Sequence, residues 1–115
     1  MNELKEHACE PCSEGSAPLP PGECGKLLAD IPGWKVVTVD AVNRLQRTFT
    51  FPDFRKALDF TNKVGELAEA EGHHPEIITA WGKVTVTWWT HTAKGLQMND
   101  FIMAAKTSEL ERAGE

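Results

Sequence analysis

The residues of this chain that are best suited to chemistry are histidines, and they gather in two short segments. These are His73, His74 and His91. Imidazole both donates and accepts protons near neutral pH, so a group of histidines suits general acid/base catalysis. Glu69 lies four residues before His73, and we expect this carboxylate to orient or charge that imidazole. We expect Asp100, which follows the second segment, to position His91 or to contact the substrate.

A metal centre is the competing use of three histidines, because zinc is often held by three of them and a water. The residue before Pro75 is driven into extended backbone, where successive side chains point in opposite directions. His73 and His74 are therefore poorly placed to share one ion, and we predict no metal at this site. The sequence near the histidines contains no activated Ser or Cys nucleophile, and the chain carries no glycine-rich phosphate loop.

A second group of potential ligands lies near the N-terminus. Cys9 and Cys12 form a Cys-x-x-Cys pair, with His7 just before it and Cys24 further on. The distance from Cys12 to Cys24 is not a strong zinc pattern, and no strand precedes the pair as in redox motifs. We interpret these residues as thiols on a loose arm, with a structural metal site and redox chemistry as the alternatives.

Length and charge narrow the class of protein. The 115 residues suffice for one domain, and the net charge of −5 argues against direct binding of nucleic acid, which needs a basic face. The sequence has no apolar run long enough to span a membrane, and residues 1–10 do not resemble a secretory signal. We therefore expect a cytoplasmic protein without nucleic-acid or membrane binding.

The elements that must position the histidines follow from hydrophobic periodicity and turn residues. Residues 1–22 predict a flexible arm, because they are rich in Ser, Gly and Pro, and residues 23–115 predict a single domain. The predicted fold is an α+β domain in αββαββα order, with a four-stranded antiparallel sheet and helices packed on one face. The expected elements are a helix over 24–31, strands over 34–39 and 44–51, a helix over 52–71, strands over 76–81 and 83–90, and a helix from Asn99 or Asp100 to about 111.

A turn at Gly82-Lys83 suggests how the second hairpin brings histidines together. If Trp81 pairs with Val84 across this turn, the same count places His74 opposite His91. The alternation along 83–90 favours Trp88 as a core residue. It leaves Trp81 and Trp89 open between core packing and stacking on a flat heterocycle. The open sheet has edge strands, so we also expect a homodimer or homotetramer.

Three segments together resemble the pterin-4a-carbinolamine dehydratases, over about residues 26–110. They are Ala68-Glu69-x-x-x-His73-His74-Pro75-Glu76, Trp81-x-x-Val84-x-Val86 and Thr90-His91-x-x-x-Gly95-Leu96-x-x-x-Asp100. The resemblance implies dehydration of 4a-hydroxytetrahydropterin to quinonoid dihydropterin, without metal or organic cofactor. It also implies recycling of the pterin used by aromatic amino acid hydroxylases, with possible functional coupling to such an enzyme. The fold of that family agrees with the order of elements predicted above.

By motif position, the resemblance assigns site residues. The catalytic set is His73, His74, His91, Glu69 and Asp100, and the substrate-binding set is His74, Pro75, Trp81 and Thr90. We expect His73 and His91 to be the acid/base pair, and His74 to hold the pterin. Gly72 and Asn99 stand where some members have Asp and Arg, which affects substrate contacts more than the reaction. The alternative function is a binding or dimerisation module that acts as a transcriptional coregulator.

Overall fold

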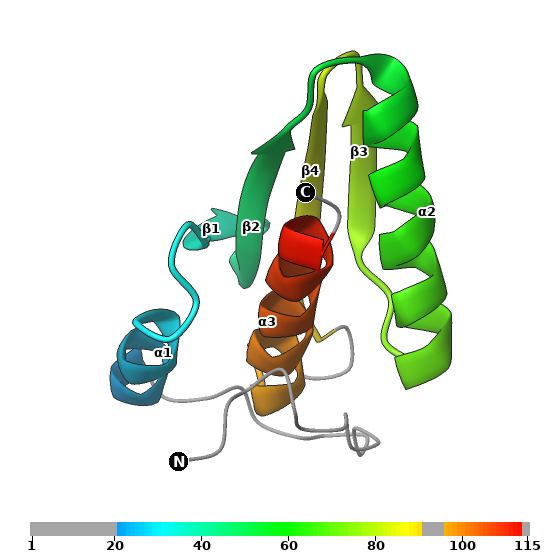
Figure 1. Cartoon of the computed structure of the whole chain (residues 1–115). Coiled ribbons are helices and arrows are strands. Elements are labelled where there is room, and N and C mark those ends of the chain that lie inside the picture. Colours follow the sequence, from blue (N-terminus) through cyan, green and yellow to red (C-terminus); the bar gives the residue numbers. More distant parts are fainter. Residues whose placement is uncertain (1–20, 91–95, 114–115) are drawn as a thin grey trace.

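The computed structural model describes residues 21–90 and 96–113, and it confirms the predicted fold class (Figure 1). A four-stranded antiparallel sheet in the order β1-β2-β4-β3 carries its helices on one side. No helix in these two described ranges is long and apolar enough to cross a membrane. The elements are α1 (Pro21–Leu28), β1 (Lys35–Val39), β2 (Val42–Thr50), α2 (Phe54–Glu71), β3 (Glu76–Ala80), β4 (Lys83–Trp88) and α3 (Met98–Ala113).

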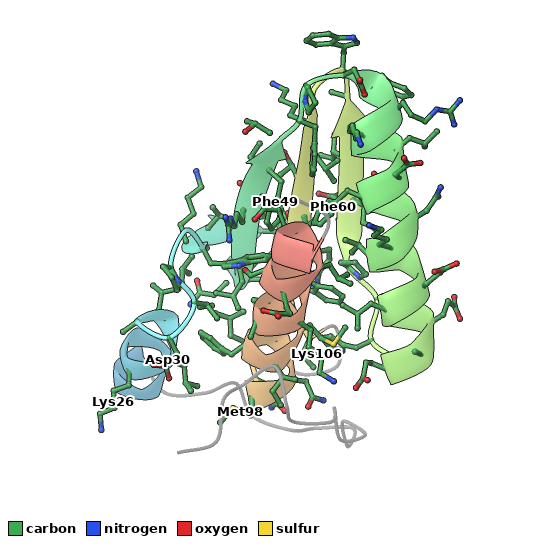
Figure 2. All side chains as sticks on the ribbon, viewed as in Figure 1. Lys26, Asp30, Phe49, Phe60, Met98 and Lys106 are labelled. Carbon is green, nitrogen blue, oxygen red and sulfur yellow. The ribbon has the colours of Figure 1, made fainter. Side chains whose placement is uncertain are left out.

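The central strands β2 and β4 form the sheet because apolar and polar residues alternate along them. The apolar set points toward the helices and is buried, while Thr48, Thr85 and Thr87 lie on the opposite face, where Thr87 is buried as well. On the helix side, the rings of Phe49 and Phe60 lie 4.8 Å apart between centroids, and both are labelled in Figure 2. The buried residues of the two strands are Leu45, Phe49, Val84, Val86, Thr87 and Trp88.

Helix α2 is defined by clear signals at both ends. Asp53 is the N-cap, and its side chain accepts a hydrogen bond from the backbone N–H of Lys56 at 2.8 Å. The predicted start at Pro52 was therefore two residues early. Gly72 ends the helix with φ of 68°, a left-handed conformation that favours glycine, and its N–H bonds to the carbonyl of Ala68. The chain consequently changes direction immediately before the two histidines.

The predicted register of the β3–β4 hairpin was wrong by two residues. Ala80 pairs with Lys83, so the two-residue loop is Trp81-Gly82 and not Gly82-Lys83. Gly82 has φ of 72° at the second loop position, which the turn requires there and glycine provides without strain. If this register is extended two residues beyond the Glu76–Thr87 pair, His74 lies opposite Trp89 and not opposite His91. A shift of two residues leaves every side chain on its predicted face.

The first and last helices also begin earlier than predicted. Helix α1 starts at Pro21, where proline is well suited because the first helical N–H needs no partner within the helix. Helix α3 starts at Met98, so Asp100 lies inside its first turn and is not its cap. This position decides what the Asp100 carboxylate contacts.

Candidate active site

Asp100 is a buried carboxylate held at the start of α3. Its side chain is fully buried, and its Oδ2 accepts hydrogen bonds from the backbone N–H of Gln97 at 2.8 Å and from Thr90 Oγ1 at 2.7 Å. Gln97 precedes the first residue of α3, so the first contact is the acidic half of a capping box. The positive end of the helix dipole favours a negative charge at this place. Both the start of α3 and Thr90, which lies two residues beyond β4, therefore fix the carboxylate.

His73 uses the remaining oxygen of this carboxylate. Its Nε2 lies 2.7 Å from Asp100 Oδ1, and only 11% of its side chain is exposed. Its ring stacks on Trp88 with an angle of 6° and 5.7 Å between centroids. Its backbone N–H bonds to the carbonyl of Ala68, which continues the helix cap. The imidazole is thus held on its face, at one ring nitrogen and through its backbone.

This geometry assigns the protons of the ring. A carboxylate only accepts hydrogen bonds, so with Asp100 ionised the Nε2 of His73 carries the hydrogen and donates it. The neutral ring then has Nδ1 as its acceptor nitrogen. Nδ1 is therefore the ring nitrogen that the Asp100 carboxylate does not contact.

His74 lies in a different environment and corrects a predicted pairing. Its Nε2 lies 3.3 Å from Glu69 Oε1, and the two side chains are 59% and 80% exposed. Glu69 thus partners His74 and not His73, because the left-handed turn at Gly72 directs His73 inward. Asp100 contacts His73, a partner that the sequence did not suggest, and its expected role of positioning His91 or contacting the substrate stays a prediction. His91 lies outside the described residues.

The remaining predicted site residues are divided between two ends of the sheet. Thr90 is buried and belongs to the site through its bond to Asp100. Pro75 lies half-buried between His74 and the first residue of β3. Trp81 lies in the hairpin loop beyond the far end of β3, about 16 Å of extended strand away, and is 73% exposed. The structure therefore does not bring Trp81 to the other residues.

Sequence reasoning missed what Trp88 does at the site. We predicted that it is a core residue, and its side chain is fully buried, but the same indole also forms the platform under His73. Its Nε1 donates to Thr107 Oγ1 at 3.2 Å, which anchors the platform to α3. The alternation along β4 was the available signal, because it directs Trp88 to the helix side of the sheet.

The described part of the chain contains no group of three or more His, Cys, Asp or Glu placed to hold a metal ion. His7, Cys9 and Cys12 lie outside the described residues, and the side chain of Cys24 is not described either. The interpretation of these residues as thiols on an arm therefore stays a prediction.

Comparison with known proteins defines the class. The family model for pterin 4 alpha carbinolamine dehydratase matches residues 17–110. A protein of Chlorobium limicola named "Putative pterin-4-alpha-carbinolamine dehydratase" is 62% identical over 96% of this chain and 97% of its own length. A protein of the same name from Syntrophotalea carbinolica is 54% identical over 96% of this chain and 98% of its own. The chain therefore belongs to the pterin-4a-carbinolamine dehydratase family.

Solved structures agree with this fold. The crystal structure of a transcriptional coactivator/pterin dehydratase from Brucella melitensis superposes with a TM-score of 0.73 and 33% identity, covering 81% of this chain and 97% of that one. A pterin dehydratase-like protein identified as a RuBisCO assembly factor in the alpha-carboxysome shares the fold, with a TM-score of 0.58 and 22% identity over 68% of this chain and 88% of that one.

Proposed function

We propose that this protein dehydrates a 4a-hydroxytetrahydropterin to quinonoid dihydropterin and water, with His73 transferring a proton. The observation that carries the proposal is the 2.7 Å contact between His73 Nε2 and the fully buried Asp100 Oδ1. An acid/base catalyst uses an imidazole whose ring is oriented by a fixed carboxylate, and this pair has that arrangement. Membership of the dehydratase family supports the choice of substrate.

The reaction is a proton-transfer problem without a redox change. The bond between C4a and the hydroxyl oxygen breaks, and that oxygen leaves as water after accepting a proton. The neighbouring ring nitrogen loses its proton, and its electron pair forms the new double bond to C4a. The enzyme must therefore supply one acid and one base, and both suit imidazole near neutral pH.

We assign the exchange of protons with the substrate to Nδ1 of His73, because Nε2 is held by Asp100. The second acid/base group in the proposal is His91, by its position in the family motif. His74 and Glu69 are exposed and only loosely paired, which suits contact with the substrate more than proton transfer. Thr90 and Pro75 complete the proposed site, Thr90 by holding Asp100 and Pro75 by fixing the backbone of His74.

The proposal extends to the setting of the enzyme. It recycles the pterin of an aromatic amino acid hydroxylase in the cytoplasm, and it acts as a homodimer or homotetramer. The edges of the sheet support self-association, since within the described residues β1 and β3 each pair with one strand only. Light scattering should give a particle at least twice the 12.7 kDa of one chain. A monomer at micromolar concentration would contradict this part of the proposal.

A coregulator of transcription is the second candidate function, and one observation favours it. The 33% identical Brucella melitensis protein is described as a transcriptional coactivator/pterin dehydratase. A binding module of that kind would not require the ordered His73–Asp100 pair. The dehydratase function therefore requires the His73–Asp100 pair, whereas the coregulator function does not.

The deciding experiment is a dehydration assay with the 4a-hydroxypterin generated in situ. We expect the full-length protein to accelerate loss of the intermediate above the spontaneous rate. A matched control is Asn62→Ala, which changes an exposed residue of α2 away from the histidines and should leave the rate unchanged. A folded protein that gives no acceleration would overturn the proposed activity and favour the coregulator.

A further inference from the structure

A cavity of about 370 Å³ lies at the end of α2 that is remote from the histidines. Its apolar lining includes Phe51 just after β2, Phe60 on α2 and Leu110 near the end of α3. The rings of Phe51 and Phe60 lie 5.2 Å apart between centroids, and Figure 2 labels Phe60. Phe60 is buried and the other two are half-buried, so these residues form a floor. The volume is at the small end of the range for ligand pockets.

Charged side chains surround this floor in equal numbers of each sign. Lys56 and Lys63 are seven residues apart on α2, and seven residues make about two turns, so they lie on one face. Asp59 lies between them, and Glu111 approaches from α3. All but the half-buried Glu111 are exposed, which places them at the rim.

None of the ion pairs found within the described part of the chain joins two of these rim side chains. Asp59 and Lys63 have the i, i+4 spacing at which helical ion pairs commonly form. The ion pairs His73–Asp100, His74–Glu69 and Lys106–Glu71, all among the described residues, nevertheless leave out the four rim side chains. Two ammonium groups and two carboxylates are therefore available to a ligand above an apolar floor.

We propose that this cavity binds a free α-amino acid with an aromatic or large aliphatic side chain. The ligand carboxylate lies near Lys56 and Lys63, and its ammonium group lies near Asp59 and Glu111. Its side chain packs on Phe51 and Phe60. A phosphorylated or purely anionic ligand would meet two carboxylates, and an uncharged apolar ligand would leave all four rim charges unused. Only a zwitterion with an apolar body matches both the floor and the rim.

The cavity is separate from the proposed catalytic site. Helix α2 has 18 residues, so its axis is about 27 Å long. Lys56 lies in its first turn, and His73 follows its last residue by two positions. Binding of an amino acid can therefore be measured without any pterin, and either proposal can fail while the other holds.

The test is a titration of the ¹⁵N-labelled full-length protein with L-phenylalanine, followed by ¹H–¹⁵N correlation spectra. We expect saturable shifts at the amides of Phe51 and Phe60 and none at Gly72. Lys63→Met and Asp59→Asn should each weaken binding about tenfold, as for loss of one hydrogen bond to a charged group. The matched control is Lys35→Met, an exposed lysine of β1 outside the cavity, which should bind as the unchanged protein does. The spectra themselves report whether each variant is folded.

Two analogues separate the two ends of the ligand. 3-Phenylpropionate lacks the ammonium group and phenethylamine lacks the carboxylate, so both should bind at least about tenfold more weakly than L-phenylalanine. Asp59→Asn should not weaken the binding of 3-phenylpropionate, because it removes a like charge, and Lys63→Met should for the same reason not weaken that of phenethylamine. Equal affinity for 3-phenylpropionate and L-phenylalanine would overturn recognition of a zwitterion. The proposal would also be overturned if the amide shifts did not saturate with L-phenylalanine, or if neither variant changed the affinity. Shifts that follow the protein concentration and not the L-phenylalanine concentration would overturn it as well.

Discussion

His73 and His74 are neighbours in the chain, and each contacts a carboxylate, yet the two pairs lie in opposite environments. The His73–Asp100 side chains are 11% and 0% exposed and 2.7 Å apart, whereas the His74–Glu69 side chains are 59% and 80% exposed and 3.3 Å apart. The left-handed residue Gly72 produces this difference by directing the chain inward for one residue. One backbone turn therefore gives two adjacent histidines different exposure and different distances to their carboxylate partners.

The difference has consequences for energy and for chemistry. An exposed ion pair contributes about 0–1 kcal/mol, because water screens it and both side chains lose freedom. A buried carboxylate that accepts three hydrogen bonds is costly to disturb, since its partners lose their acceptor where water does not replace it. We therefore expect changes at His73 and Asp100 to affect both rate and fold strongly, and changes at His74 and Glu69 to be mild.

The largest effect is expected for His73→Ala. Loss of a general acid or base typically lowers kcat by about 10²–10⁴-fold, limited here by the spontaneous dehydration rate. His74→Ala is the matched control, and it should raise KM more than it lowers kcat. Steady-state kinetics of the two variants checks this. Nearly normal turnover in a folded His73→Ala variant would contradict the role assigned to the buried pair.

Asp100→Ala is expected to show the greatest loss of stability. It removes the acceptor of His73, of Thr90 and of the Gln97 N–H, so the free energy of unfolding should fall by about 2–4 kcal/mol. Urea denaturation followed by circular dichroism measures this change. A loss below about 0.5 kcal/mol would mean that these contacts do not order the end of α3.

Gly72→Ala tests the turn that separates the two histidines. A methyl group there meets no atom within 4 Å, so the cost is conformational and should be about 1 kcal/mol. We expect a modest fall in kcat together with this loss, because the turn directs His73 toward Asp100. Gly65→Ala is the control, since that glycine is helical and its added methyl also meets nothing within 4 Å. The control should be neutral or stabilising, and equal losses in both variants would refute the argument from the turn.

The smallest effect is expected for Glu69→Gln. This change removes the charge of an exposed pair, so stability should change by less than about 0.5 kcal/mol. Because Glu69 is the partner of His74, we expect the variant to show a higher KM for the pterin and a nearly unchanged kcat. Thermal unfolding and the dehydration assay provide the two values. A loss of stability as large as that of Asp100→Ala would remove the contrast between the two pairs.

Much of the fold was predictable because its signals are local. The alternation along β2 and β4 and the helical spacing of Ala57, Phe60, Val64 and Ala68 are properties of short segments. The hairpin register was missed because Gly82 suits either position of a two-residue loop. Only the pairing of β3 with β4 decides between the two positions.

The types of residue at the candidate site were predictable, but their pairing was not. Asp100 belongs to α3 and His73 follows α2, and the packing of these elements on one sheet brings them within 2.7 Å. Sequence distance suggested Glu69 for His73, because four residues correspond to one helical turn. The helix ends at Gly72, so that spacing no longer applies to His73. Tertiary packing and a local change of backbone direction thus decided the partners.

The central claim is that His73 and Asp100 act as one proton-transfer unit, and a double-mutant cycle tests it most directly. The measurement is kcat for dehydration by His73→Ala, by Asp100→Asn and by the double variant, with folding checked by circular dichroism. Residues that act as a unit are strongly non-additive, so the double variant should be about as slow as the slower single variant. A kcat for the double variant that falls by the product of the two single losses would contradict the claim.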